Sequence, residues 1–69
     1  MEAYQQRVAD EQAELDIKIG KLLVFLGTSK YHDSDKEEQE RMQRQYIAMK
    51  TYSEVLAERL AAFNTPSKP

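Results

Sequence analysis

A stripe of apolar residues at heptad spacing, between residues 42 and 63, limits this chain to helical folds. The stripe advances by alternating steps of four and three residues, with one polar interruption: Met42, Tyr46, Met49, Ser53, Leu56, Leu60 and Phe63. Such steps place every member on one side of an α-helix, and no Gly or Pro interrupts the segment. The pattern therefore predicts a long helix that packs along another helix.

A second segment, from residue 3 to residue 26, carries two apolar stripes on opposite sides. The first has the same spacing and is interrupted at Glu11 and Gln12; its apolar members are Tyr4, Val8, Leu15, Ile19, Leu22 and Leu26. The second consists mostly of small residues: Ala9, Ala13, Ile17, Gly20 and Val24. A helix with one partner needs one apolar stripe, so the second stripe predicts a further helix on that side. Gly20 either permits a close helix crossing there or marks a bend.

A short polar segment separates the two predicted helices. Gly27 is placed to end the first helix, and Ser34 with Glu37 is a capping-box pattern that puts the start of the second helix near Asp35. The chain is thus predicted to be all-α, an antiparallel two-helix, coiled-coil-like hairpin in residues 1–64. Its helices are expected at about 3–26 and 35–63, joined by a loop at 27–34. Two prolines favour a disordered tail at residues 65–69.

The apolar surface of this hairpin exceeds what two helices can cover. A chain of 69 residues forms at most one domain and buries only a small core. Without cysteine it has no disulfides, and with a single histidine it is not expected to hold a metal. Beside the second helix's stripe lies another apolar flank: Ala48, Tyr52, Val55 and Ala62. The hairpin is therefore predicted to assemble into a homo-oligomeric helical bundle.

Charge and composition exclude several classes of function. The net charge of −2 comes from 10 basic and 12 acidic residues that are interspersed, so no general attraction to DNA, RNA or anionic membranes is expected. The longest apolar run, residues 22–26, is too short to span a bilayer, and the first residues do not resemble a signal peptide. The expected location is the cytoplasm. His32 has no nucleophile or second histidine at a useful spacing, and the acidic residues at 33–40 fit a helix start, so neither an enzyme nor a cofactor is expected.

Basic and aromatic residues border the apolar faces of both predicted helices. Five of them are candidates for ligand binding: Arg41, Arg7, Tyr4, Tyr52 and Arg59. These side chains could form salt bridges between protomers and cover apolar surface with their stems. Alternatively, they could line a cleft between subunits, in which arginines bind phosphates and a tyrosine ring stacks on a base. The polar interruptions, the pair Glu11-Gln12 and Ser53, either fix the register of the helices or line a wet pocket.

The residue pattern resembles that of small phage anti-defence proteins that form helical hairpins. The resemblance covers residues 4–63 and is carried by Tyr4-Gln5-Gln6-Arg7-Val8, Lys18-Ile19, Phe25-Leu26, Gln43, Gln45, Tyr52-Ser53, Val55-Leu56 and Arg59. This family includes the sponges directed against the CBASS and Thoeris defence systems. It implies a homo-oligomer, a hexamer in the sponges, that binds cyclic nucleotide immune signals in pockets between protomers. Arg41 corresponds to an arginine at the start of the family's second long helix, whereas the sponges' N-terminal arm and a lysine near the position of Ala9 have no counterpart here.

Two functions remain open at this point. The first is a phage protein that sequesters cyclic oligonucleotides or cyclic ADP-ribose isomers in the host cytoplasm and does not cleave them. Arg41, Arg7 and Arg59 would then hold phosphates, and Tyr4 or Tyr52 would stack on a base. The second is a non-catalytic helical module that binds another protein through its exposed apolar faces.

Overall fold

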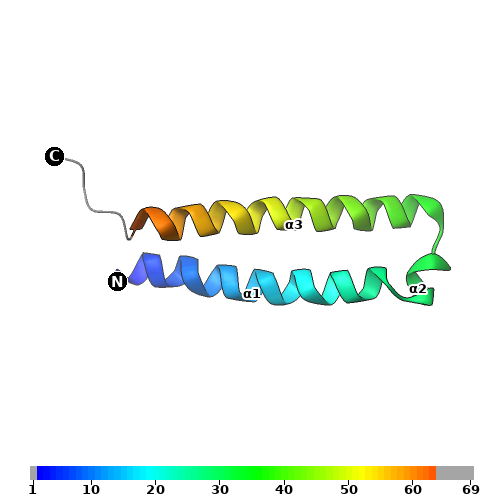
Figure 1. Ribbon diagram of the computed structural model, residues 1–69, viewed down its shortest axis with the longest axis horizontal. Coiled ribbons are helices and arrows are strands. Elements are labelled where there is room, and N and C mark those ends of the chain that lie inside the picture. The colour runs from blue at the N-terminus through cyan, green and yellow to red at the C-terminus, as the bar shows by residue number, and fades with distance from the viewer. Residues whose placement is uncertain (1, 64–69) are drawn as a thin grey trace.

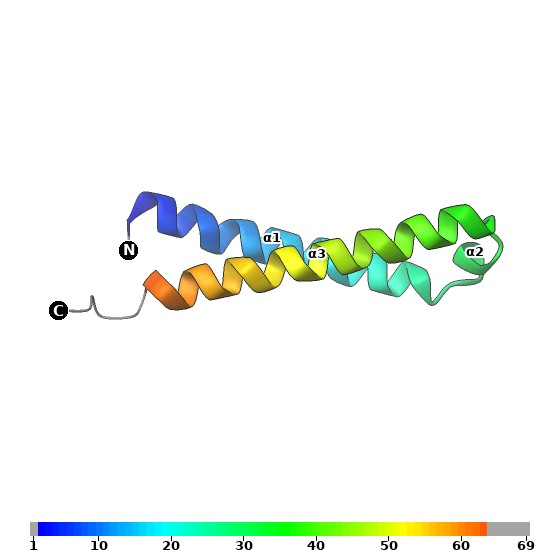
Figure 2. The ribbon, with the colours of Figure 1, turned by 90° about the horizontal axis from the view of Figure 1, so that it is seen from above.

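Two long antiparallel helices and a short third one make up the protein. The structure is a computed structural model that describes residues 2–63. Helix α1 spans Ala3–Leu26, α2 spans Ser29–His32 and α3 spans Lys36–Phe63. α1 and α3 lie side by side in opposite directions, with α2 at the turn between them (Figure 1). Seen from above, the two long helices cross at a shallow angle (Figure 2). The prediction of an all-α fold built from long helices packed against each other is confirmed, and the tail predicted at residues 65–69 lies outside the described residues.

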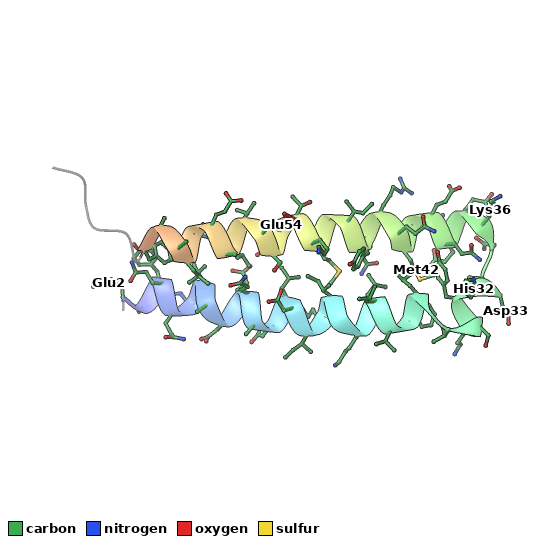
Figure 3. The ribbon with its side chains drawn as sticks, in the orientation of Figure 1. Glu2, His32, Asp33, Lys36, Met42 and Glu54 are labelled. Atoms are coloured by element: carbon green, nitrogen blue, oxygen red, sulfur yellow. The ribbon has the colours of Figure 1, made fainter. Side chains whose placement is uncertain are left out.

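The core lies along the two predicted stripes. Val8, Leu15 and Leu56 are buried, and Leu56 is only 1% exposed. Other members of the stripes pack against these three: Ile19, Met49, Leu60 and Phe63. Met42 points between the two long helices near α2 (Figure 3). At the interruption of the first stripe, Gln12 faces the partner helix, whereas Glu11 is exposed. The first stripe therefore passes through Gln12.

The segment predicted as a loop contains a helix with a buried aromatic residue. Tyr31 in α2 is 6% exposed, and its ring packs edge-on against Phe25, with the ring centroids 6.4 Å apart. The Tyr31 hydroxyl accepts a hydrogen bond of 2.6 Å from Gln43 Nε2. The Thr28 hydroxyl caps α2 by accepting a 3.3 Å hydrogen bond from the Tyr31 backbone N–H. Because the segment is mostly polar, its sequence did not predict that the core extends into it.

Gln39 of α3 holds the turn in place. Its amide nitrogen Nε2 lies 3.2 Å from the Tyr31 carbonyl oxygen, 3.1 Å from that of His32 and 3.0 Å from that of Ser34. One side chain thus donates to backbone carbonyl groups at and just beyond the C-terminal end of α2. Such carbonyl groups have no hydrogen-bond donor within the helix itself. We call Tyr31, Gln39 and Gln43 the turn clamp.

The N-terminus of α3 is capped one residue later than predicted. The Asp35 carboxylate accepts a 2.8 Å hydrogen bond from the Glu38 backbone N–H, which makes Asp35 the N-cap. The Ser34 hydroxyl instead donates to the Lys30 carbonyl at 3.0 Å. The predicted capping box of Ser34 with Glu37 is therefore wrong. Both Asp and Ser are good N-caps, and packing of the turn selects between them.

Within residues 2–63, none of the helices is both long and apolar enough to cross a membrane.

Candidate ligand-binding face

The five predicted ligand-binding residues all lie on the surface. Arg7, Arg41 and Arg59 are exposed, and Tyr4 and Tyr52 are 49% and 45% exposed. Arg41 lies near the start of α3, next to α2, whereas Arg59 near the end of α3 and Tyr4 and Arg7 near the start of α1 lie towards the opposite end of the hairpin. At 1.5 Å per residue, Arg41 and Arg59 are separated by about 27 Å along the helix axis. One small molecule therefore cannot contact both arginines of the same protomer.

Four of these residues nevertheless share one face of the hairpin, which we call the cationic face: Arg7, Arg41, Tyr52 and Arg59. Nine residues along an α-helix correspond to two and a half turns, so positions nine apart point in opposite directions. Lys50 is nine positions from Arg41 and nine from Arg59, and Asp16 is nine from Arg7. Asp16 and Lys50 line one groove on the other face of the hairpin. The arginines therefore point away from that groove.

The arginines of the cationic face differ in their partners. The Arg41 Nε donates to the Glu38 carboxylate at 2.7 Å, and both side chains remain about half exposed. Such a surface pair contributes little to folding, about 0.2 to 1 kcal/mol. Among residues 2–63, Arg7 and Arg59 have no ion-pair partner. Their guanidinium groups are thus available to an anionic ligand or to another protomer.

Tyr4 lies apart from the cationic face, at the end of the hairpin. Its ring packs edge-on against that of Phe63, with the centroids 5.6 Å apart. This contact ties the first turn of α1 to the last turn of α3. Tyr4 is therefore already engaged in a structural contact, although half of its surface is still accessible.

The opposite face carries the groove, which sequence reasoning did not locate. The groove has a volume of about 370 Å³ and runs between the middle of α1 and the middle of α3. Its lining combines polar and charged residues with small and apolar ones: Gln12, Asp16, Ile19, Gly20, Lys50, Ser53, Glu54 and Ala57. A Cβ added at Gly20 would meet nothing within 4 Å, so α1 and α3 do not cross closely there. We call this side of the hairpin the groove face.

Hydrogen bonds between the two helices occupy three polar side chains of the groove face: Gln12, Asp16 and Ser53. The Ser53 hydroxyl donates to the Asp16 carboxylate at 2.6 Å, and Gln12 Nε2 donates to the Ser53 carbonyl at 3.4 Å. The two interruptions in the apolar stripes thus meet each other across the hairpin. This contact fits the interpretation that they set the register, and the adjoining groove fits the alternative that they border a wet pocket. In the sequence, the only indication of this contact is that Ser53 interrupts an apolar stripe. The fold shows that its partner is Asp16.

The charges of the groove do not suit an anionic ligand. Two carboxylates, Asp16 and Glu54, face one cation, Lys50. Among residues 2–63, no group of three or more acidic, histidine or cysteine side chains could hold a metal ion. His32 lies in α2 and packs edge-on against the Tyr31 ring at 5.2 Å. A phosphate-bearing ligand would therefore find its cations on the cationic face.

The fold and these two faces define a class of small helical-hairpin proteins that expose charged and aromatic side chains on open surfaces. Within that class, the chain belongs to the Sequestin family, whose model matches residues 2–62. It is also similar to an uncharacterized 7.5 kDa protein in the denB–rIIB intergenic region of Enterobacteria phage T4. The two are 43% identical over 63 residues, which cover 91% of this chain and 98% of that protein. No solved structure matches the chain. The resemblance to small phage proteins is thereby confirmed at the level of the family.

Proposed function

We propose that this protein is a phage anti-defence protein that binds a cyclic nucleotide immune signal and sequesters it in the host cytoplasm without cleaving it. The name of the Sequestin family, which covers residues 2–62, denotes sequestration, and the T4 relative comes from a phage. The ligand would be a cyclic oligonucleotide or a cyclic ADP-ribose isomer, held in pockets between protomers of a homo-oligomer such as a hexamer.

The cationic face is the observation that carries this proposal. Arg7 and Arg59 are exposed and have no ion-pair partner among residues 2–63, so their guanidinium groups can bind phosphates in a bidentate way. Tyr52 exposes 45% of its surface between the two arginines of α3, where its ring can stack on a base. Because Arg41 lies about 27 Å from Arg59 along the helix axis, a compact ligand that binds both kinds of site would need these two arginines from different protomers.

A filtration assay tests the proposal directly. Purified protein is mixed with each of a set of signals: cyclic dinucleotides, cyclic trinucleotides and cyclic ADP-ribose isomers. The protein is then removed by ultrafiltration, and the free signal in the filtrate is measured. We expect at least one signal to be depleted from the filtrate and to be recovered intact after the protein is heat-denatured. Full recovery of every signal in the first filtrate would refute sequestration, and recovery of a cleaved product would refute the absence of catalysis.

The exposed apolar side chains support a second candidate, a helical module that binds another protein. Val24, Ile47 and Ile17 are 72%, 61% and 59% exposed. A thermal-shift screen separates the candidates because a ligand raises the melting temperature only of the protein that binds it. A sponge is stabilised by its nucleotide, whereas a protein-binding module is not stabilised by any of the signals.

A further inference from the structure

We infer that α3 pairs in an antiparallel manner with α3 of a second copy, across the cationic face and around a two-fold axis near residue 50. This inference rests on the proposed function and specifies its site. In this pairing Arg41 of one protomer lies next to Arg59 of the other. Each end of the interface then holds two arginines from different protomers, which one protomer alone cannot bring together.

The first support is the symmetry of the surface itself. A two-fold interface is isologous, so each residue must meet a counterpart at the same distance on the other side of the axis. Arg41 and Arg59 are both nine positions from residue 50, and Ala48 and Tyr52 are both two positions from it. At about 100° per residue, all four lie on one side of α3, within about 40° of each other. The large Tyr52 ring of one copy therefore faces the small Ala48 of the other.

The second support is the unburied apolar surface at the centre of this stripe. Tyr52 and Val55 are 45% and 46% exposed, although neither contributes to the core between α1 and α3. Exposed apolar side chains that form a patch rimmed by charges are typical of protein–protein interfaces. Packing against an antiparallel copy covers this patch in both protomers at once. Tyr52 then serves the interface instead of stacking on a base, and the arginines at the two ends are left to bind the ligand.

The third support is charge complementarity at the two ends. Glu38 already binds Arg41 at 2.7 Å, and its side chain is still 47% exposed. In the antiparallel pairing, Arg59 of the second copy lies beside the same Glu38 carboxylate. The negative charge of Glu38 then reduces the electrostatic repulsion between Arg41 and Arg59. Guanidinium groups from two different protomers then lie side by side at each end, where a phosphate of the sequestered ligand would bind between them.

Single cysteines provide a sharp test because the chain has none of its own. Ala48→Cys places a thiol on the cationic face near the proposed axis, and Ala57→Cys places one nine positions away, on the groove face. Both alanines are exposed in α3, so the two variants are matched. With a short bismaleimide crosslinker, we expect a covalent dimer from Ala48→Cys and none from Ala57→Cys. Equal crosslinking of both, crosslinking of Ala57→Cys alone, or crosslinking of neither would overturn the pairing.

A charge inserted into the interface gives an independent test in solution. Val55→Asp should lower the apparent mass of the oligomer in light scattering, because it buries a carboxylate against the apolar patch. Ile47→Asp is the control, since Ile47 is more exposed than Val55 but lies away from the stripe. If Ile47→Asp dissociates the oligomer and Val55→Asp does not, the proposed face is wrong.

The crosslinking result also separates this inference from the proposed function. Depletion of a signal in the filtration assay without crosslinking of Ala48→Cys would leave sequestration standing and refute the α3 pairing. Crosslinking of Ala48→Cys with full recovery of every signal would establish the pairing and refute sequestration.

Discussion

The two faces of the hairpin use their polar groups in different ways. On the groove face, Ser53 and Gln12 form hydrogen bonds that join α3 to α1. On the cationic face, Arg7 and Arg59 have no ion-pair partner within residues 2–63, and Arg41 pairs only with a neighbour on its own helix. Gln12, Asp16 and Ser53 on the groove face therefore hold the hairpin together, whereas Arg7 and Arg59 on the cationic face are available to something outside it. Substitutions on the two faces should accordingly separate stability from binding.

The largest effect should come from Leu56, which lies beneath both faces. Because Leu56 is only 1% exposed, Leu56→Ala leaves a cavity in a small core and should lower the free energy of unfolding by about 2 to 5 kcal/mol. Urea unfolding followed by circular dichroism measures this loss. Ile47→Ala, at a side chain that is 61% exposed, should cost far less, and an equal cost at both positions would contradict the assignment of the core.

Arg59→Glu should affect binding and spare stability. The substitution removes a cation that has no ion-pair partner among residues 2–63 and places a carboxylate where a phosphate is proposed to bind. We expect capture of the signal to weaken by roughly 10- to 100-fold, since a hydrogen bond to a charged group contributes about 1.5 to 3 kcal/mol. Titration in the filtration assay measures the change. Lys50→Glu, on the groove face, is the matched control, and an equal loss there would mean that the ligand binds in the groove.

Ser53→Ala should lower stability and leave binding unchanged, the reverse of Arg59→Glu. It removes the 2.6 Å hydrogen bond to Asp16 and should lower the free energy of unfolding by about 0.5 to 1.5 kcal/mol. Capture of the signal should remain unchanged. Thr51→Ala, at an exposed position of the same helix, serves as the control for hydroxyl loss. A loss of capture with unchanged stability would assign Ser53 to the ligand site.

Gly20→Ala should produce the smallest change, and a favourable one. A Cβ at Gly20 meets nothing within 4 Å, so the gain in helix propensity should raise the stability by about 0.5 to 1 kcal/mol. Thermal unfolding would show this as a higher melting temperature. A lower melting temperature would instead show that another protomer packs closely against the small-residue stripe of α1.

The regular part of the fold could be predicted from the sequence because it depends on local periodicity. Steps of four and three residues place Leu56 and Val8 on the packed sides of their helices, and both are buried. Tyr31 could not be found in this way, because a single aromatic residue in a polar turn has no periodic neighbours. Asp35 and Ser34 are adjacent and equally good caps, so only the geometry of the turn distinguishes them.

The candidate site was predictable in part for the same reason. Helical spacing is sufficient to place Arg41, Tyr52 and Arg59 on one edge of a helix. The groove, in contrast, depends on a contact between Asp16 and Ser53, which are 37 positions apart in the sequence. No local pattern specifies that pairing. The assembly and the ligand depend on molecules beyond the single chain, and they stay predictions.

The turn clamp has a consequence for the order in which the hairpin folds. Phe25, Tyr31 and Gln43 meet within a stretch of fewer than twenty residues, whereas Tyr4 and Phe63 meet only when nearly the whole described chain is closed. Closing a short loop costs less conformational entropy than closing a long one. Folding should therefore start at the turn and proceed towards the free ends of α1 and α3. Backbone amides near the clamp should accordingly exchange with solvent more slowly than those near Tyr4 and Phe63.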